Sequence, residues 1–310
     1  MKKREFLAAG IGICASLGPF TVAALAQSEH EVAAPIHAER ARRQTPRRMA
    51  KTTPLFKVPT MSAGGWVAGW PNSLASAPDG LWIGEQRHDG KPECAWLMDW
   101  NGKLVKTVMT QSKDTSGIAY GDGYIWMGAN TDKENGFFQT DMNSKLIAIH
   151  QIPLGPKDNG GSTHGALWND GKLWIVANRL RAILRVDPKT WEPEYQIPII
   201  LPRETPRFHG IAWDNGAIWI VTGNDSKNYG EGRPGLAKLD SATGEVLELV
   251  EFVPGSCDPH GLTMHNGALI SCDAGEHPGW PIGTNTVEIS HSTSGGNSPF
   301  GGSVFSIEII

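Results

Sequence analysis

A short unit recurs five times along this chain, and its spacing is the strongest constraint on the fold. Each copy is an apolar run that leads into a Gly-containing turn and out into a second run, often rich in Ile, Val and Trp. This is the pattern of a β-hairpin. Aligned on the hairpins, the first positions of the copies are Asn72, Ser116, His164, His209 and His260. The steps between these positions are 44, 48, 45 and 51 residues.

A period near 45 residues with strand signals and turn glycines is typical of a β-propeller, in which each repeat forms one four-stranded blade. The chain ends in residues 303–308, which match the third strand of a repeat, so the last repeat lacks its fourth strand. A strand at residues 55–59 can supply it and remove an exposed sheet edge. The sequence therefore predicts an all-β, five-bladed β-propeller over residues 54–310, closed by an N-terminal strand that completes the last blade.

Tryptophan recurs at one position of the second strand of the unit. The four residues are Trp82, Trp126, Trp174 and Trp219. An aromatic residue that recurs once per repeat is typical of packing between blades, so we expect core positions here rather than a ligand platform.

Residues 1–26 have the features of an export signal. Basic residues at positions 2–4 precede an apolar stretch, and Ala24-Leu25-Ala26 is a small-residue cleavage site. Lys3-Arg4 and the residues after it resemble the twin-arginine export motif, with Lys in place of the first Arg; a general secretory signal is the alternative. Pro19 and the glycines interrupt the apolar stretch, which disfavours a retained membrane span. The sequence predicts a periplasmic or secreted protein.

Residues 27–53 differ in composition from the rest of the chain. Five arginines fall between positions 40 and 48, and apolar residues are few. This predicts a flexible basic linker, which is either a solvated tether or a contact for anionic lipid or another protein. The whole chain carries a net charge of −4, so no general basic field favours nucleic acid as a partner.

Three cysteines remain once Cys14 leaves with the signal. They are Cys94, Cys257 and Cys272, of which the last two flank the fifth hairpin and could form a disulfide in an oxidising compartment. No Cys-x-x-Cys pair occurs, which disfavours a thiolate metal site.

Histidine opens three consecutive repeats, each time followed by Gly. In a propeller, the first residues of the inner strands lie around the axis at one end, so His164, His209 and His260 can point at a common atom. Three imidazoles with open positions are typical of a catalytic site for a divalent ion, most typically zinc, and disfavour calcium. The alternative is that each imidazole caps a loop. His150 and His265 are expected to be structural or exposed.

The loops after the second strands should converge on the same end of the ring. They supply candidate catalytic residues, with Glu85 or His277 as general base and Arg87 or Arg179 as a partner for a carboxylate or an oxyanion. A long insertion over residues 274–302 is expected to cover the axial site as a lid. Candidate substrate-binding residues at this end are Asn72, Asn130, Asn178, Asn224, Trp70 and Trp280.

The hairpin with His-Gly at its start and Asp-Gly or Asn-Gly before a Trp-bearing strand resembles the virginiamycin B lyase-like and gluconolactonase-like propellers. The three histidines also resemble the metal-binding set of peptidyl-hydroxyglycine amidating lyases, which implies one zinc on the axis held by His164, His209 and His260. Those relatives have six or seven blades, whereas this chain supplies residues for five.

Two classes of function fit these patterns. The first is an exported, metal-dependent propeller enzyme, a lyase or a lactone or ester hydrolase, that acts on a small molecule at the axial site. The second is a non-enzymatic propeller that holds a ligand or a protein at the same end. The chain lacks a nucleophile elbow, a P-loop and a dinucleotide fingerprint, which disfavours serine hydrolase, kinase and nicotinamide chemistry.

Overall fold

A computed structural model describes residues 45–58, 61–62, 65–66, 69–87, 90–129, 136–153, 163–201, 207–223, 235–274 and 301–310. Within these residues the chain is all-β apart from one 3₁₀ helix, η2 (Asn178–Leu180). In this part of the chain no helix has the length and apolarity needed to cross a membrane. The strands β2 (Met61–Ser62) and β3 (Gly65–Trp66) form a small hairpin.

Most strands belong to sheets of consecutive antiparallel strands. The first such sheet contains β4 (Trp70–Ala77), β5 (Gly80–Gln86), β6 (Cys94–Met98) and β7 (Leu104–Met109). The second contains β8 (Thr115–Gly121), β9 (Tyr124–Ala129), β10 (Phe137–Asp141) and β11 (Leu146–His150). The third contains β12 (Thr163–Asn169), β13 (Lys172–Ala177), β14 (Ala182–Val186) and β15 (Pro193–Pro198).

The remaining strands form one eight-stranded sheet in the order β16-β17-β18-β19-β1-β22-β21-β20. One half contains β16 (Arg207–Asp214), β17 (Ala217–Gly223), β18 (Gly235–Asp240) and β19 (Val246–Phe252). The other half contains β1 (Arg47–Lys57), β22 (Ser303–Ile309), β21 (Ala268–Cys272) and β20 (Leu262–His265). The N-terminal strand β1 joins the halves, because it pairs antiparallel with β22 and parallel with β19.

The start of β1 corrects the expected linker. Residues 47–53, predicted to be part of a flexible basic segment, form most of this strand. Their positive charges lie against acidic residues of the neighbouring strands, since Arg47 pairs with Glu251 at 3.2 Å and Lys51 with Glu308 at 3.0 Å. Charge pairing across strands therefore makes a strand compatible with a sequence that is poor in apolar residues.

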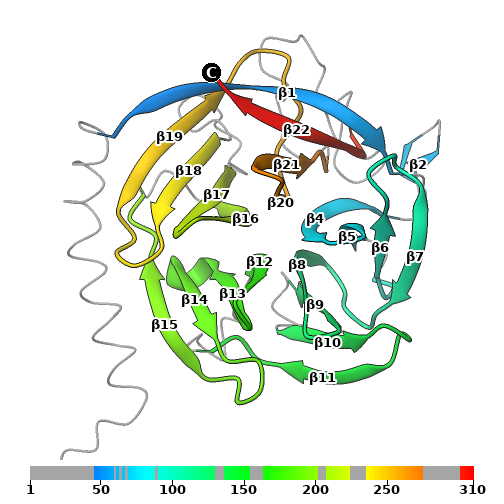
Figure 1. Cartoon of the computed structure of the whole chain (residues 1–310). Helices are drawn as coiled ribbons and strands as arrows, with labels where there is room; N and C mark the ends of the chain where they lie inside the picture. The colour runs from blue at the N-terminus through cyan, green and yellow to red at the C-terminus, as the bar shows by residue number, and fades with distance from the viewer. Residues whose placement is uncertain are drawn as a thin grey trace, which may run out of the picture.

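The sheets surround a central axis, with β4, β8, β12, β16 and β20 innermost and β7, β11, β15, β19 and β1 at the rim (Figure 1). Each layer around the axis is one of the four-stranded sheets or one half of the eight-stranded sheet. Buried apolar clusters fill the spaces between neighbouring layers. One of them joins β4–β6 to β21 and β22 through Leu74, Ile83 and Val304, so the first and last layers in sequence pack on each other. The four recurring tryptophans, Trp82, Trp126, Trp174 and Trp219, are buried core residues, as predicted.

The inner strands approach one another through glycine. In β4, β8, β12 and β16 the pairing register shifts at the same place, which is the signature of a β-bulge. A side chain at Gly165 would collide with the backbone oxygen of His209, and one at Gly210 would collide with the backbone of Leu262. Glycine is thus required at the bulges of β12 and β16, because the next strand occupies the space of a side chain.

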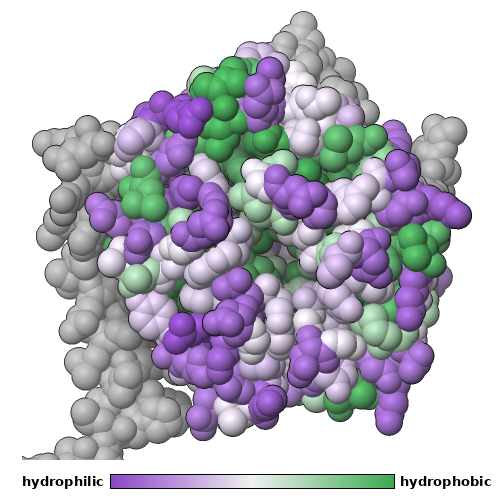
Figure 2. Space-filling view, in the orientation of Figure 1, coloured by the Kyte–Doolittle hydropathy of each residue, from purple (hydrophilic) through white to green (hydrophobic). Residues whose placement is uncertain are grey.

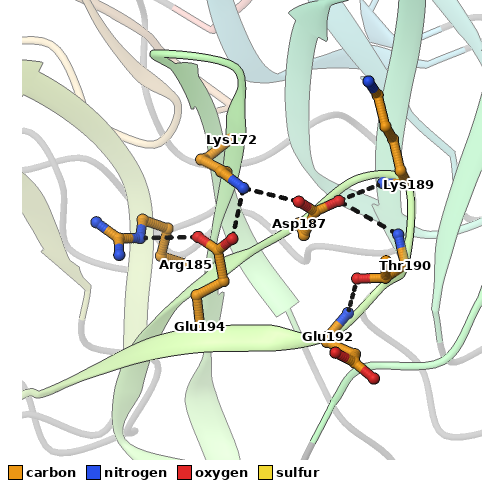
Figure 3. Close-up of polar contacts among 7 residues, drawn as sticks. All are labelled: Lys172, Arg185, Asp187, Lys189, Thr190, Glu192 and Glu194. Atoms are coloured by element: carbon orange, nitrogen blue, oxygen red, sulfur yellow. Dashed lines mark hydrogen bonds and ion pairs between the residues drawn. The ribbon is translucent and has the colours of Figure 1, made fainter.

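Aspartate stands at or just after the end of the third strand in four successive layers and shapes the turn that follows. In each case one carboxylate oxygen accepts hydrogen bonds from backbone N–H groups a few residues on, as in an Asx-turn. The residues are Asp99, Asp141, Asp187 and Asp240. At Asp187 the second oxygen also accepts from Lys172 at 2.7 Å, within a network that includes Glu194 and Arg185 (Figure 3).

The contact at Gly210 predicts a large loss of stability on Gly210→Ala, by about 3 kcal/mol, because the added methyl group meets packed backbone that cannot move aside. Gly123→Ala is the matched control. That residue has a φ of 79° but open space around it, so only backbone strain of about 1 kcal/mol is expected. Urea unfolding of both variants measures the difference. Equal losses would show that the axial contact is not tight.

The network around Asp187 predicts acid sensitivity. The hydrogen bond from Lys172 is the largest cause that lowers the pKa of Asp187, from 3.8 to about 2. This contribution to stability is complete above pH 3.8 and is lost as the pH falls toward about 2. The melting temperature of Asp187→Asn should therefore fall less steeply over this range than that of the wild type. The pair is partly exposed, so the difference will be small, and parallel curves would contradict the assignment.

Candidate functional site

Three imidazoles meet near the axis. His164 and His209 lie in the bulges of β12 and β16. His260 lies two residues ahead of β20, where its backbone N–H donates to the Cys272 carbonyl at 3.0 Å. The Nδ1 atoms of His164 and His209 are 3.3 Å apart, and the ring centroids of His209 and His260 are 4.0 Å apart. All three side chains are buried, with at most 4% exposure. The structure therefore brings together the three predicted metal ligands.

The fit of a metal to these rings can be judged from the nitrogen positions. Two nitrogens that each lie about 2.0–2.1 Å from a tetrahedral zinc ion are about 3.3–3.4 Å apart. The separation of the two Nδ1 atoms, 3.3 Å, fits this geometry, and it also fits a hydrogen bond between the rings. Among the described residues no group of three or more His, Cys, Asp or Glu side chains is placed so that it could hold a metal ion. Imidazole is a ligand type that zinc commonly takes, but in their present places the three rings do not form a metal-binding group.

The other side of the axis carries an amide and a hydroxyl. Asn72 and Ser116 occupy the positions in β4 and β8 that the histidines occupy in later strands. The Asn72 amide nitrogen donates to the Thr115 carbonyl at 2.8 Å and to Ser116 Oγ at 3.2 Å. Both side chains are 1% exposed. The axial end thus has an imidazole half and an amide–hydroxyl half.

Glu85 is buried, and contacts within its own layer engage both carboxylate oxygens. One oxygen accepts from the backbone N–H and the thiol of Cys94, each at 3.0 Å, and the other lies 3.3 Å from Arg87. Burial, followed by the nearby Glu85 charge, raises the pKa of the Cys94 thiol. The predicted catalytic pair, Glu85 and Arg87, therefore forms an ion pair at the edge of the first sheet, and its catalytic role stays a prediction.

Asn178, a predicted substrate-binding residue, is held by protein groups. Its side-chain amide donates to the Phe208 carbonyl at 3.2 Å and accepts from the Phe208 N–H at 3.3 Å. These bonds join η2 to the strand residue just before His209, so Asn178 orients that strand.

The other predicted residues divide between described and undescribed parts of the chain. Trp70 is buried at the start of β4. Arg179 lies in η2, where the structure describes its backbone but not its side chain. Asn130, Asn224, His277 and Trp280 lie outside the described residues, as does most of the expected lid.

The other described histidines, His150 and His265, and the described cysteines take structural positions. His150 stacks on Trp191 with ring centroids 4.2 Å apart, and His265 stacks on Trp100 at 3.8 Å. Within the described residues all cysteines are buried free thiols, so the disulfide considered between Cys257 and Cys272 does not form. Burial is the main cause that raises the pKa of Cys257 to about 12.

Sequence reasoning missed Glu93, a fully buried carboxyl just ahead of β6. Its oxygens accept from the backbone N–H groups of Arg87 at 2.7 Å and Thr115 at 2.8 Å. Thr115 in turn accepts from Asn72, so Glu93 supports the amide–hydroxyl half. Burial raises the pKa of Glu93 to about 8. Its sequence signal is weak, because a Glu at the end of a loop is exposed by default.

Glu93 predicts a pH-dependent stability. The folded protein keeps this proton up to about pH 8, whereas a carboxyl in the unfolded chain loses it near 4.5. The contribution is therefore complete below pH 4.5 and is lost as the pH rises toward about 8. Glu93→Gln, which cannot ionise, should flatten the fall in unfolding free energy between these limits, as measured by urea titration. An unchanged slope would show that Glu93 does not hold the proton.

Comparison with known proteins supports the fold. No family model matches the sequence, and no curated protein matches it significantly. A glutaminyl cyclase structure from Myxococcus xanthus is similar over 86% of this chain and 98% of its own, with 11% identity and a TM-score of 0.55. A streptogramin B lyase structure covers 84% of this chain and 98% of its own, with 13% identity and a TM-score of 0.46. The similarity to the cyclase shows a β-propeller fold.

Proposed function

We propose that the chain forms a closed ring of five four-stranded blades in which β1 is the outer strand of the last blade. Three observations support this arrangement. β1 pairs with β22 at the rim, and five apolar clusters of described residues lie between successive layers. At the axis, the Ser76 N–H donates to Thr263 Oγ1 at 3.0 Å, which joins the inner strands of the first and last blades.

We further propose that this propeller is an exported, metal-dependent enzyme, a lyase or a lactone or ester hydrolase acting on a small molecule at the axial end. The observation that carries the proposal is the meeting of three buried imidazoles from successive layers. Neutral imidazoles are among the commonest zinc ligands in proteins. A similar fold in a glutaminyl cyclase supports the enzyme class only, because the identity is too low to carry a reaction.

The residues of the chain have separate roles in this proposal. His164, His209 and His260 hold the ion, which when bound polarises a substrate carbonyl or activates water. Asn72 and Ser116 bind the substrate on the opposite side. Asn178 is a positioning residue, because it fixes the backbone ahead of His209. Burial of the site excludes bulk water, which strengthens every polar interaction there.

A non-enzymatic ligand-binding propeller is the second candidate. The observation that favours it is that the protein itself engages Glu85 and Asn178, two polar residues expected to act on a substrate. In that case the axial residues bind a ligand and leave it unchanged.

Metal analysis of the purified protein tests the proposal. After incubation with zinc and gel filtration, the wild type should retain about one ion per chain, and each of His164→Ala, His209→Ala and His260→Ala should bind at least about 100-fold more weakly. His265→Ala is the control, because that ring stacks on Trp100 and lies at the far end of β20. Circular dichroism melting establishes that each variant folds. A wild type that retains no zinc, or axial variants that all retain it, would contradict the metal site.

A further inference from the structure

The orientation of the Asn72 amide follows from its neighbours. Its nitrogen lies 2.8 Å from the Thr115 carbonyl oxygen, which can only accept a hydrogen bond. If the amide were turned over, two acceptor oxygens would face each other without a proton between them. The nitrogen must therefore face Thr115, and the Asn72 oxygen Oδ1 must face away from it.

That oxygen is a buried acceptor. Asn72 is 1% exposed, and among the described residues Oδ1 has no hydrogen-bond donor. More than nine-tenths of buried polar groups in proteins have a partner, because leaving one unpaired is costly. The cost is tolerated where a ligand supplies the missing donor, and Asn72 occupies the axial position of its blade.

Ser116 offers the complementary group. Its oxygen accepts from the Asn72 nitrogen at 3.2 Å, so its own hydrogen is not used in that bond. No acceptor for this hydrogen is found in the described part of the chain. Asn72 and Ser116 together therefore present one acceptor and one donor side by side, and both are buried.

The pair lies next to the imidazoles. A side chain at Gly261, which follows His260, would meet the Ser73 Cα at 2.7 Å. The segment that leads from His260 into β20 therefore touches the strand that carries Asn72. The amide–hydroxyl half thus adjoins the imidazole half at one end of the ring.

We propose that Asn72 and Ser116 form the subsite for a neutral amide of the ligand, with the amide N–H donating to Asn72 Oδ1 and the amide C=O accepting from the Ser116 hydroxyl. This subsite rests on the proposed function, in which the axial end is the ligand site. It deepens that proposal by placing an amide of the substrate beside the group that faces the imidazoles. An ester or lactone has no donor for Oδ1, and a carboxylate would repel it. A primary amide or a lactam satisfies both groups at once.

Three small probes of nearly equal size test the subsite. 2-Pyrrolidone carries both an N–H and a C=O, N-methyl-2-pyrrolidone lacks the N–H, and γ-butyrolactone has a ring oxygen in its place. Ligand-observed NMR titrations should give about tenfold tighter binding of 2-pyrrolidone than of either analogue. Equal affinities of the three probes would overturn the proposal.

Two variants assign the preference to its residues. In Asn72→Leu the three probes should bind alike, because the acceptor is gone. In Ser116→Ala all three should bind more weakly, but the preference for the N–H should remain, because Asn72 Oδ1 is still present. If Asn72→Leu does not fold, a crystal of the wild type soaked with 2-pyrrolidone decides the point. The lactam nitrogen should lie about 3 Å from Asn72 Oδ1, and a structural water that stays in its place would refute the subsite.

Titrations of both zinc-loaded and chelator-treated protein separate this subsite from the metal site. An N–H preference in both preparations supports the subsite even if zinc does not bind. Zinc retention without any N–H preference leaves the metal site standing and removes the amide subsite.

Discussion

The contact between inner strands at the axis is the constraint on which the rest of the structure depends. Glycine follows the axial residue in β8, β12 and β16, and the neighbouring backbone fills the space that a side chain would need. Packed backbone is nearly incompressible, so these contacts set how closely the inner strands approach one another around the axis. That spacing in turn sets how closely residues from separate layers approach. The imidazoles of His164 and His209 lie 5.0 Å apart because the strands that carry them are in contact.

This arrangement separates the requirements of the fold from those of the site. The bulge recurs in β4, β8, β12 and β16, and glycine follows the axial residue in all of these except β4, where Ser73 follows Asn72. The axial residue itself lies outside the pairing register and differs from strand to strand. That position holds Asn72, Ser116 or histidine without any change in the scaffold around it. Each layer thus contributes one variable side chain to a common centre, and the fold alone does not determine which residues stand there.

Much of the fold could be predicted because the repeat carries local signals. Each hairpin contains its own turn glycine, and the recurring tryptophans, such as Trp126, are buried as their spacing indicates. The convergence of His164, His209 and His260 followed from their equivalent positions. What failed were features that depend on partners far away in the chain. The strand at residues 47–53 looked like a linker because its stabilising partners, Glu251 and Glu308, lie more than 200 residues away.

The same reason explains the misread polar residues. A glutamate such as Glu93 or an amide such as Asn178 looks like a solvated loop residue until the fold brings a backbone group to it. Phe208 binds Asn178 across 30 residues, and Thr115 binds Glu93 across 22. Sequence patterns show which residues lie at equivalent positions along the axis. Hydrogen bonds between layers depend on details of loop conformation that no local pattern contains.

The position of β1 has a consequence for how the protein is made. This strand is synthesised before β4 to β21, yet its antiparallel partner β22 is synthesised after all of them. Pairs between the two strands, such as Lys51 with Glu308, can form only after β22 has been synthesised. Contacts of such long sequence separation are slow to form, so β1 lacks its antiparallel partner while the blades fold. Once made, the same contacts hold β1 and β22 in one sheet, so neither strand can separate without breaking its pairing with the other.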